Sequence, residues 1–260
     1  MRTDGTCDTL FSGAISCRQP SGGYRFSLDA VLLAHFVMPG KKSRLVDLGA
    51  GCGVIGLIAL YRHAHIASCL AIEAQDELAS IAQENFRANG FADKTTVMRD
   101  DAARIREFLP AQCADLALCN PPYYQLGRGR KSRRDGECLA RHQATPFAVF
   151  AQAAAWCLGK GGQAAFIYPA AQLAELFATC DMAKLAVKKL RLIHSYPGAA
   201  ATRALILCRK EGGAGLAAAA PLFVYEQKNG RYSAEVARMY AANAAMRDTP
   251  VAGDDPCWRN

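Results

Sequence analysis

The chain has 260 residues, 51% of them apolar and 21% charged, a composition typical of a globular protein that buries its core without disulfides or metal ions. No apolar run approaches the roughly 18 to 20 residues that span a bilayer, and the first residues form no apolar signal core, so we expect neither membrane insertion nor export. The net charge of +8 is compatible with a polyanionic partner.

The first elements are short. Two extended segments at 9–11 and 14–18 precede a turn-rich stretch and predict an N-terminal hairpin. Ser27 is then a candidate N-cap of a helix at 29–37, which a Pro-Gly pair ends.

Strands and helices alternate in the next part of the chain. Apolar runs predict strands at 45–48, 70–73, 95–98 and 115–119. Helical periodicity predicts helices at 54–63 and 76–89 and a short helix that ends near residue 108. Because the loops between them are of ordinary length, this alternation predicts a parallel, doubly wound α/β sheet.

Residues 125–143 break the pattern, with three glycines and no periodic apolar positions. The segment carries the cations Arg128, Arg130, Lys131, Arg133, Arg134 and Arg141. A loop of this length at the carboxyl end of a strand is more often functional than not, and a solvated surface loop is the alternative.

The remaining elements complete the sheet. We expect helices at 147–158 and 170–180, a glycine-rich stop at 159–162 and a strand at 163–168. Strands at 185–194 and 203–209 must pair antiparallel as an edge hairpin, because no crossover helix fits between them. Residues 221–225 and 231–236 predict a terminal hairpin, and we expect a disordered tail from residue 248.

The 11 cysteines lie between Cys7 and Cys257 without a Cys-x-x-Cys pair, and the five histidines also lack ligand spacing. We therefore expect small buried thiols in a reducing cytoplasm, and no metal site.

The strand at 115–119 ends abruptly at Asn120, Pro121, Pro122, Tyr123 and Tyr124. In an open α/β sheet, ligands bind at the carboxyl ends of the strands. Because proline has no backbone N–H, the carbonyls of Asn120 and Pro121 lack their usual partners. These acceptors beside an aromatic ring suit a planar ligand that carries an NH2 group, such as a nucleobase or an amide. An ordinary strand followed by a Pro-Pro turn is the alternative.

A G-x-G-x-x-G pattern at 51–56, with Glu73 about twenty residues later, suits either a dinucleotide or an adenosyl cofactor. Asp47, two residues before Gly49, favours the adenosyl cofactor, because a carboxylate there repels a pyrophosphate but attracts the ammonium and sulfonium of S-adenosylmethionine. We expect Glu73 to bind the ribose and either Asp100 or Asp101 to reach the adenine. Each aspartate could instead be a helix N-cap.

Two sets of motifs carry a resemblance. Asp47-x-Gly49-x-Gly51-x-Gly53, Glu73 and Asn120-Pro121-Pro122-Tyr123 together resemble the amino-group methyltransferases of the class I fold. More narrowly, the segments at 23–33, 141–142 and 197–203 are similar to the tRNA(Val) adenine-N6-methyltransferase family, over most of the chain. Tyr124 stands where Phe is common in that family, and Gln143 where an acid often follows Arg-His.

The resemblance implies a mostly parallel, seven-stranded, Rossmann-like α/β sheet with an antiparallel edge hairpin and small hairpins at both ends. We expect an N-terminal extension at 1–23, the methyltransferase domain at 24–211, an addition packed on that domain at 212–247, and the tail at 248–260.

The implied activity is transfer of a methyl group from S-adenosylmethionine to an exocyclic amino group of a nucleic-acid base, with N6 of adenine in tRNA as the first candidate. The implied catalytic residues are Asn120, Pro121, Pro122 and Tyr123. The implied cofactor-binding residues are Tyr24, Phe26, Asp47, Gly49, Gly51, Gly53, Glu73, Asp100, Asp101 and Asn120. The implied RNA-binding residues are Tyr123, Tyr124, Arg128, Arg130, Lys131, Arg133 and Arg134.

Other functions use the same features. Glutamine methylation on a protein and N2 methylation of guanine need the same acceptors. A nicotinamide oxidoreductase would use the glycine motif, and an RNA-binding module without catalysis would use the charge, although the intact Asn-Pro-Pro-Tyr argues against it. The oligomeric state cannot be inferred from these patterns.

Overall fold

The computed structural model describes residues 5–20, 27–122 and 146–241. The expected basic loop at 125–143 and the expected disordered tail lie outside the described residues. Within these ranges, no helix is long and apolar enough to cross a bilayer.

The strands form a two-stranded hairpin and one large sheet. They are β1 (Gly5–Leu10), β2 (Ile15–Pro20), β3 (Arg44–Leu48), β4 (Ser68–Ile72), β5 (Thr95–Met98), β6 (Ala114–Cys119), β7 (Leu158–Pro169), β8 (Leu185–His194), β9 (Ala201–Lys210), β10 (Ala217–Ala218) and β11 (Leu222–Phe223). In the described part of the chain the sheet has nine strands in the order β10-β8-β9-β7-β6-β3-β4-β5, with β11 also paired to β8. Strands β3 to β7 are mutually parallel, and β9 runs antiparallel between β7 and β8, which confirms the doubly wound fold with an antiparallel edge.

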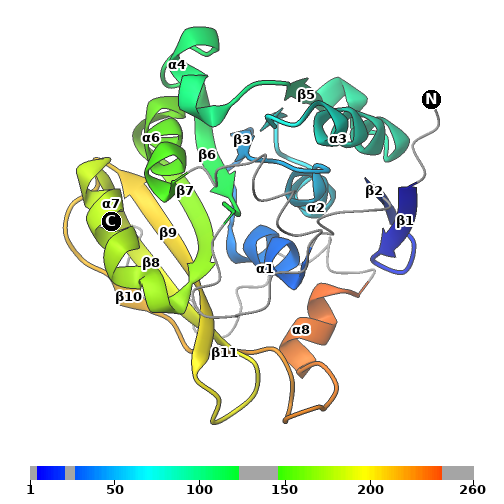
Figure 1. Cartoon of the computed structure of the whole chain (residues 1–260), viewed down its shortest axis with the longest axis vertical. Coiled ribbons are helices and arrows are strands. Elements are labelled where there is room, and N and C mark those ends of the chain that lie inside the picture. Colours follow the sequence, from blue (N-terminus) through cyan, green and yellow to red (C-terminus); the bar gives the residue numbers. More distant parts are fainter. Residues whose placement is uncertain (1–4, 21–26, 123–145, 242–260) are drawn as a thin grey trace, which may run out of the picture.

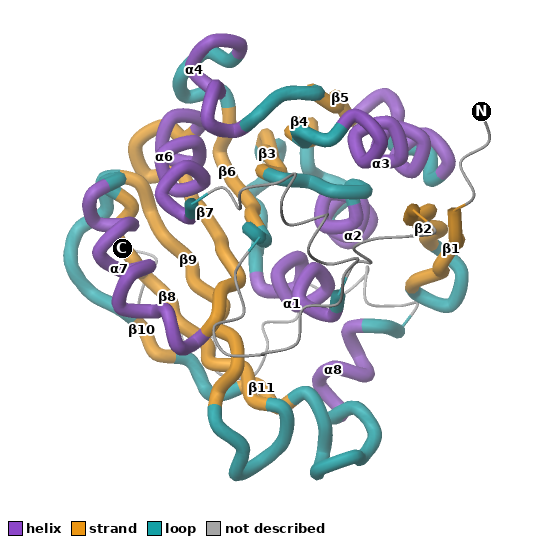
Figure 2. Tube along the Cα trace, viewed as in Figure 1, coloured by secondary structure: helices purple, strands orange, loops and turns teal. Residues whose placement is uncertain are grey.

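Helices cover both faces of this sheet (Figures 1 and 2). The α-helices are α1 (Leu28–Phe36), α2 (Val54–Arg62), α3 (Asp76–Ala88), α4 (Ile105–Phe108), α6 (Phe147–Cys157), α7 (Leu173–Met182) and α8 (Ala234–Met239). Short 3-10 turns are η1 (Ala92–Lys94), η2 (Ala102–Arg104) and η3 (Ala170–Gln172). One apolar core lies between the sheet and α1, α2 and α3, and a second lies between the sheet and α4, α6 and α7.

Helix α3 shows how the sequence pattern produces this packing. Ala79, Ala82 and Phe86 are buried at helical spacing, while the acids Asp76 and Glu77 occupy the first turn, where the helix dipole favours negative charge. The chain leaves the helix through Gly90, whose φ of 76° is a conformation that glycine adopts readily.

The N-terminal hairpin is also as expected, since β1 and β2 pair antiparallel. It is fixed on α3 by side-chain amides. Asn85 accepts a hydrogen bond from the backbone N–H of Arg18 at 2.8 Å, and Asn89 accepts one from that of Ser16 at 2.9 Å. Sγ of Cys17 in β2 lies 3.8 Å from Sγ of Cys52, so the hairpin is docked beside the turn between β3 and α2.

The expected C-terminal hairpin is present, with an antiparallel bridge between Tyr225 and Tyr232. Two local expectations need correction. The glycine-rich residues 159–162 do not separate α6 from its strand, because β7 begins at Leu158 and accommodates them in an irregular stretch of its pairing with β6. The strand predicted at 231–236 is wrong beyond Tyr232, since helix α8 follows there with Ser233 as its N-cap.

Candidate functional site

Four neighbouring parallel strands bring the expected polar residues to one edge of the sheet. Leu48, the last residue of β3, pairs with the last residues of β4 and β6 on either side. The residues that follow these strands, Gly49, Glu73 and Asn120, therefore lie next to one another. Strand β5, beside β4, leads to Asp100 at the same edge.

The turn after β3 depends on left-handed glycines. Gly49, Gly51 and Gly53 have φ values of 69°, 57° and 81°. A Cβ on Gly53 would lie 3.1 Å from the ring of Phe86, and one on Gly49 would lie 3.3 Å from the ring of Phe150. A Cβ on Gly51 would meet no atom of the described residues within 4 Å. The turn is thus packed against α6 at Gly49 and against α3 at Gly53, while no described side chain packs on Gly51.

Two carboxylates hold this turn through its backbone amides. The N–H of Gly51 donates to Oε2 of Glu73 at 2.8 Å, and the N–H of Gly56 donates to Oδ2 of Asp47 at 3.1 Å. The other oxygen of Glu73 accepts from the N–H of Gln75 at 2.9 Å. Amides that would face a phosphate in a dinucleotide site are therefore already paired with acids.

Asp47 is completely buried, and its Oδ1 has no hydrogen-bond partner among the described residues. The pKa of this carboxyl is raised to about 7: burial is the largest cause, the hydrogen bond from Gly56 opposes the shift, and the charge of Glu73 adds to it. Near neutral pH a cationic ligand at this point would favour the ionised form and satisfy the open oxygen.

Asn120 follows β6 directly. Its Oδ1 is buried and has no partner within the described ranges. Pro121 is buried and Pro122 is exposed. A buried amide oxygen without a partner is costly in a folded protein, so an acceptor left open at a strand tip indicates a ligand that donates a hydrogen bond there.

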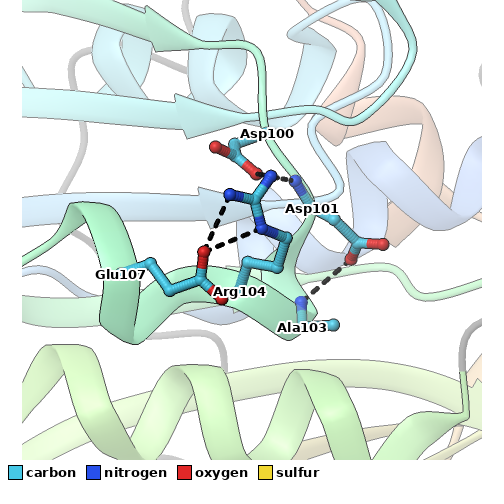
Figure 3. Close-up of polar contacts among 5 residues, drawn as sticks. All are labelled: Asp100, Asp101, Ala103, Arg104 and Glu107. Carbon is cyan, nitrogen blue, oxygen red and sulfur yellow. Dashed lines mark hydrogen bonds and ion pairs between the residues drawn. The ribbon is translucent and has the colours of Figure 1, made fainter.

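Asp100 and Asp101 follow β5 and have local partners (Figure 3). Oδ1 of Asp101 accepts from the N–H of Ala103 at 2.9 Å and caps η2, as one of the two sequence interpretations expected. Oδ1 of Asp100 accepts from the N–H of Asp101 at 2.8 Å and lies 3.4 Å from Arg104, which also pairs with Glu107 at 2.7 Å. Each aspartate keeps a second carboxylate oxygen for further contacts.

Several expected site residues cannot be placed. Tyr24, Phe26, Tyr123, Tyr124, Arg128, Arg130, Lys131, Arg133 and Arg134 lie outside the described residues. Among the residues that are described, no three of His, Cys, Asp and Glu gather at metal-binding distance.

Asn85, which no sequence motif marked as a site residue, is buried and donates through Nδ2 to the carbonyl oxygen of Cys52 at 2.9 Å. The side chain thus ties α3 and the N-terminal hairpin to the glycine turn. The sequence does carry a signal for it, because the polar Asn85 occupies an apolar position of the helical pattern, seven residues after Leu78 and four after Ile81.

The sequence of this chain is similar to those of known proteins. The sequence model of the methyltransferase small domain family matches residues 28–184. A Shewanella sp. strain MR-7 protein named tRNA1(Val) (adenine(37)-N6)-methyltransferase is 27% identical over 190 residues, which are 72% of this chain and 79% of that protein. A Shewanella frigidimarina protein of the same name is 28% identical over 188 residues, 71% of this chain and 74% of that protein.

Solved structures share the fold. A crystal structure described as a predicted O-methyltransferase from Agrobacterium tumefaciens has a TM-score of 0.67 at 26% identity and covers 84% of this chain and 96% of its own. TYW2 of P. horikoshii, crystallised with MeSAdo, has a TM-score of 0.55 at 18% identity and covers 81% of this chain and 73% of its own. The matched region contains the glycine turn, both buried acids and Asn120, and the chain belongs to the methyltransferase small domain family.

Proposed function

We propose that this methyltransferase uses S-adenosylmethionine to methylate an exocyclic amino group of a nucleic-acid base, and that N6 of adenine in tRNA is its target. The observation that carries the proposal is the buried, unpartnered Oδ1 of Asn120 beside the glycine turn. The names of the Shewanella relatives, which describe adenine-N6 methylation of a tRNA, support the choice of base and of RNA.

The residues around the turn fit this cofactor better than a dinucleotide. A pyrophosphate would meet Asp47 and Glu73, and the amides of Gly51 and Gly56 already donate to those acids. The open Oδ1 of Asp47 suits a cation instead. S-adenosylmethionine carries an ammonium group and supplies a methyl group on a sulfonium, an electrophile that needs no metal ion.

Each acid then has a distinct task. Glu73 accepts from the ribose hydroxyls while it holds Gly51, and Asp47 lines the turn with negative charge. Asp100 and Asp101 follow the neighbouring strand β5. Their second carboxylate oxygens are candidates to accept a hydrogen bond from the amino group of the adenine. Tyr24 and Phe26, which precede α1 in the sequence, close the pocket in this proposal.

Asn120 and Pro121 prepare the nucleophile. The lone pair of an aromatic amine is delocalised into the ring, so the amine is a weak nucleophile. Its two hydrogens donate to Oδ1 of Asn120 and to the carbonyl of Pro121, which draws the nitrogen towards pyramidal geometry in line with the methyl group. Tyr123 stacks on the base, an interaction worth about 1 to 3 kcal/mol. The proton leaves an acidic ammonium, so no strong base is required.

An oxygen nucleophile fits this site less well, although one solved relative is described as a predicted O-methyltransferase. A hydroxyl must lose its proton to a general base as it attacks. The amide of Asn120 accepts a hydrogen bond but cannot take up that proton. Side-chain amides of protein glutamine and N2 of guanine use the same acceptors and remain the nearest rivals.

The deciding experiment incubates the protein with methyl-labelled S-adenosylmethionine and either bulk tRNA or total protein, digests the products and identifies the modified unit by mass spectrometry. We expect label in tRNA as N6-methyladenosine, and none with Asn120→Ala. Label in glutamine would identify a protein as the substrate, and label in N2-methylguanosine would identify guanine as the base, so either result would contradict the proposal. Binding of reduced nicotinamide, detected by its fluorescence, would instead favour an oxidoreductase.

A further inference from the structure

Three tyrosine rings stack in the C-terminal segment. The centroids of Tyr225 and Tyr232 lie 5.3 Å apart with 12° between the ring planes, and those of Tyr232 and Tyr240 lie 5.7 Å apart with 4° between the planes. The antiparallel bridge fixes the first pair, and α8 carries the third ring close by. The rings are thus held parallel by the fold.

Two of these rings are open to solvent. Tyr225 and Tyr232 expose 36% and 40% of their surface, although large apolar side chains elsewhere in the described chain are mostly buried. Because Tyr232 already stacks on both Tyr225 and Tyr240, a further planar ring can extend this stack at its exposed Tyr225 end. This geometry suits the base of a nucleotide better than an aliphatic partner.

The surroundings of the stack are basic. Lys228 and Arg238 are exposed, and within the described ranges neither has a carboxylate partner. The nearby acids Glu226 and Glu235 are each paired with an arginine at 2.7 Å. Two cations of the same segment therefore remain available for phosphate groups.

The stack lies at the same edge of the sheet as the candidate site. Strand β8 is parallel to β7 and β6, since both β7 and β8 are antiparallel to β9. Strand β11 runs parallel to β8, so the segment that follows it leaves the carboxyl edge, and α8 packs on α1 there (Figure 1). Four strand spacings separate β6 from β11, roughly 19 Å. Five or six stacked nucleotides, at about 3.4 Å each, span that distance.

We propose that Tyr225 and Tyr232, with Lys228 and Arg238, form a platform that binds unpaired nucleotides of the RNA near the methylated base. The inference rests on the proposed function and extends it from the target base to the adjoining RNA. The rings supply stacking that tolerates any base, and the cations contact the backbone. The platform holds the RNA while Asn120 engages the target.

The test compares the paired variant Tyr225→Ala with Tyr232→Ala against wild type. We expect the Kd for bulk tRNA to rise about 5- to 150-fold, the range that loss of one stacked base produces. KM for tRNA should rise while kcat at saturation and the affinity for S-adenosylhomocysteine stay unchanged. The pair Tyr225→Phe with Tyr232→Phe keeps both rings and should bind within about twofold of wild type. Lys228→Gln with Arg238→Gln should reduce the salt dependence of binding.

Met182→Ala provides a matched surface control. Met182 is 83% exposed at the end of α7, which runs back from the carboxyl end of β7 to the opposite edge of the sheet. Its removal should leave tRNA affinity unchanged. Loss of affinity in this control equal to that in the alanine pair would overturn the assignment.

A second measurement does not depend on the variants folding. Wild-type protein is photocrosslinked to tRNA that contains 4-thiouridine, and the peptides that carry RNA are identified. We expect adducts within residues 225–240. Adducts only elsewhere, or an unchanged Kd in the alanine pair, would overturn the platform while leaving methylation of tRNA intact. A wild-type protein that neither binds nor methylates tRNA would remove the proposed function, and the platform with it.

Discussion

Asp47→Asn should change how the stability of the protein depends on pH. The pKa of Asp47 is raised from 3.8 to about 7, chiefly by burial. Between about pH 4 and pH 7 the folded chain holds this proton and the unfolded chain does not, so unfolding releases a proton. The free energy of unfolding therefore falls as the pH rises through this window and levels off above about pH 7.

The size of the effect follows from the two pKa values. At about 1.4 kcal/mol per pH unit, the interval from 3.8 to about 7 corresponds to a loss of about 4 kcal/mol, of which about 2 kcal/mol falls between pH 5 and pH 7. Asparagine keeps the shape of the side chain and can still accept from Gly56, but it cannot ionise. The ligand-free variant should thus gain about 2 kcal/mol relative to wild type over those two pH units.

Urea unfolding at pH 5, 6, 7 and 8 measures this difference. Other titrating groups, such as the half-buried His35, whose pKa is lowered to about 3 chiefly by desolvation, contribute equally to both proteins and cancel. Asp115→Asn is the matched control. A hydrogen bond from Arg44 lowers the pKa of Asp115, so the contribution of this carboxylate to the free energy of unfolding changes only at acidic pH. A constant difference between wild type and Asp47→Asn across the series would refute the argument from burial.

Four further outcomes follow from the site. Asn120→Ala should bind S-adenosylhomocysteine with nearly wild-type affinity in calorimetry yet lose turnover; strong residual methylation would contradict the role of the amide. Glu73→Ala should weaken S-adenosylhomocysteine binding at least tenfold, about 1.4 kcal/mol, because Gly51 and the ribose both lose an acceptor; unchanged heats of binding would argue against this position. Replacing the four cations within residues 130–134 by glutamine should lower the slope of log Kd for tRNA against log salt by about 0.7 to 0.9 for each phosphate that the protein no longer neutralises, and an unaltered slope would assign RNA binding elsewhere. Gly53→Ala should cost more stability in thermal unfolding than Gly51→Ala, because both strain a left-handed backbone by about 1 to 2 kcal/mol but only Gly53 would also press on a ring; equal costs would exclude that steric effect.

Much of the fold could be predicted because its signals are local. The apolar runs locate β3, β5 and β6 to within a residue, and their alternation with helices specifies a parallel sheet. The doubly wound rule then places the ends of these strands together, which is why Asn120, Glu73 and Gly49 could be expected at one edge before any coordinates were known.

The wrong predictions concern segments whose sequence pattern is compatible with two kinds of secondary structure. Residues 231–236 alternate as a strand does, yet Ser233 accepts a hydrogen bond from the N–H of Val236 at 3.3 Å and begins α8, with Glu235 in its first turn. A capping serine with an acid in the first turn is a helix signal that the alternation concealed. Similarly, a glycine-rich run commonly ends a strand or helix, but β7 pairs with β6 at Leu158 and again from Gln163, so the strand continues across 159–162.

The hydrogen bonds of the site could not be predicted, because they depend on how the strands align. The sequence places Asp47 and Glu73 on adjacent strands, but only the structure shows them holding the amides of Gly56 and Gly51.

These hydrogen bonds favour a cationic over an anionic ligand at the turn. An anion would find the amides engaged and two carboxylates facing it, whereas a cation would satisfy the open Oδ1 of Asp47 and lower its pKa. The glycine motif alone serves either kind of ligand. In the proposed function, the class of cofactor therefore follows from the acids that hold the glycines, and the glycines determine how closely that cofactor can approach.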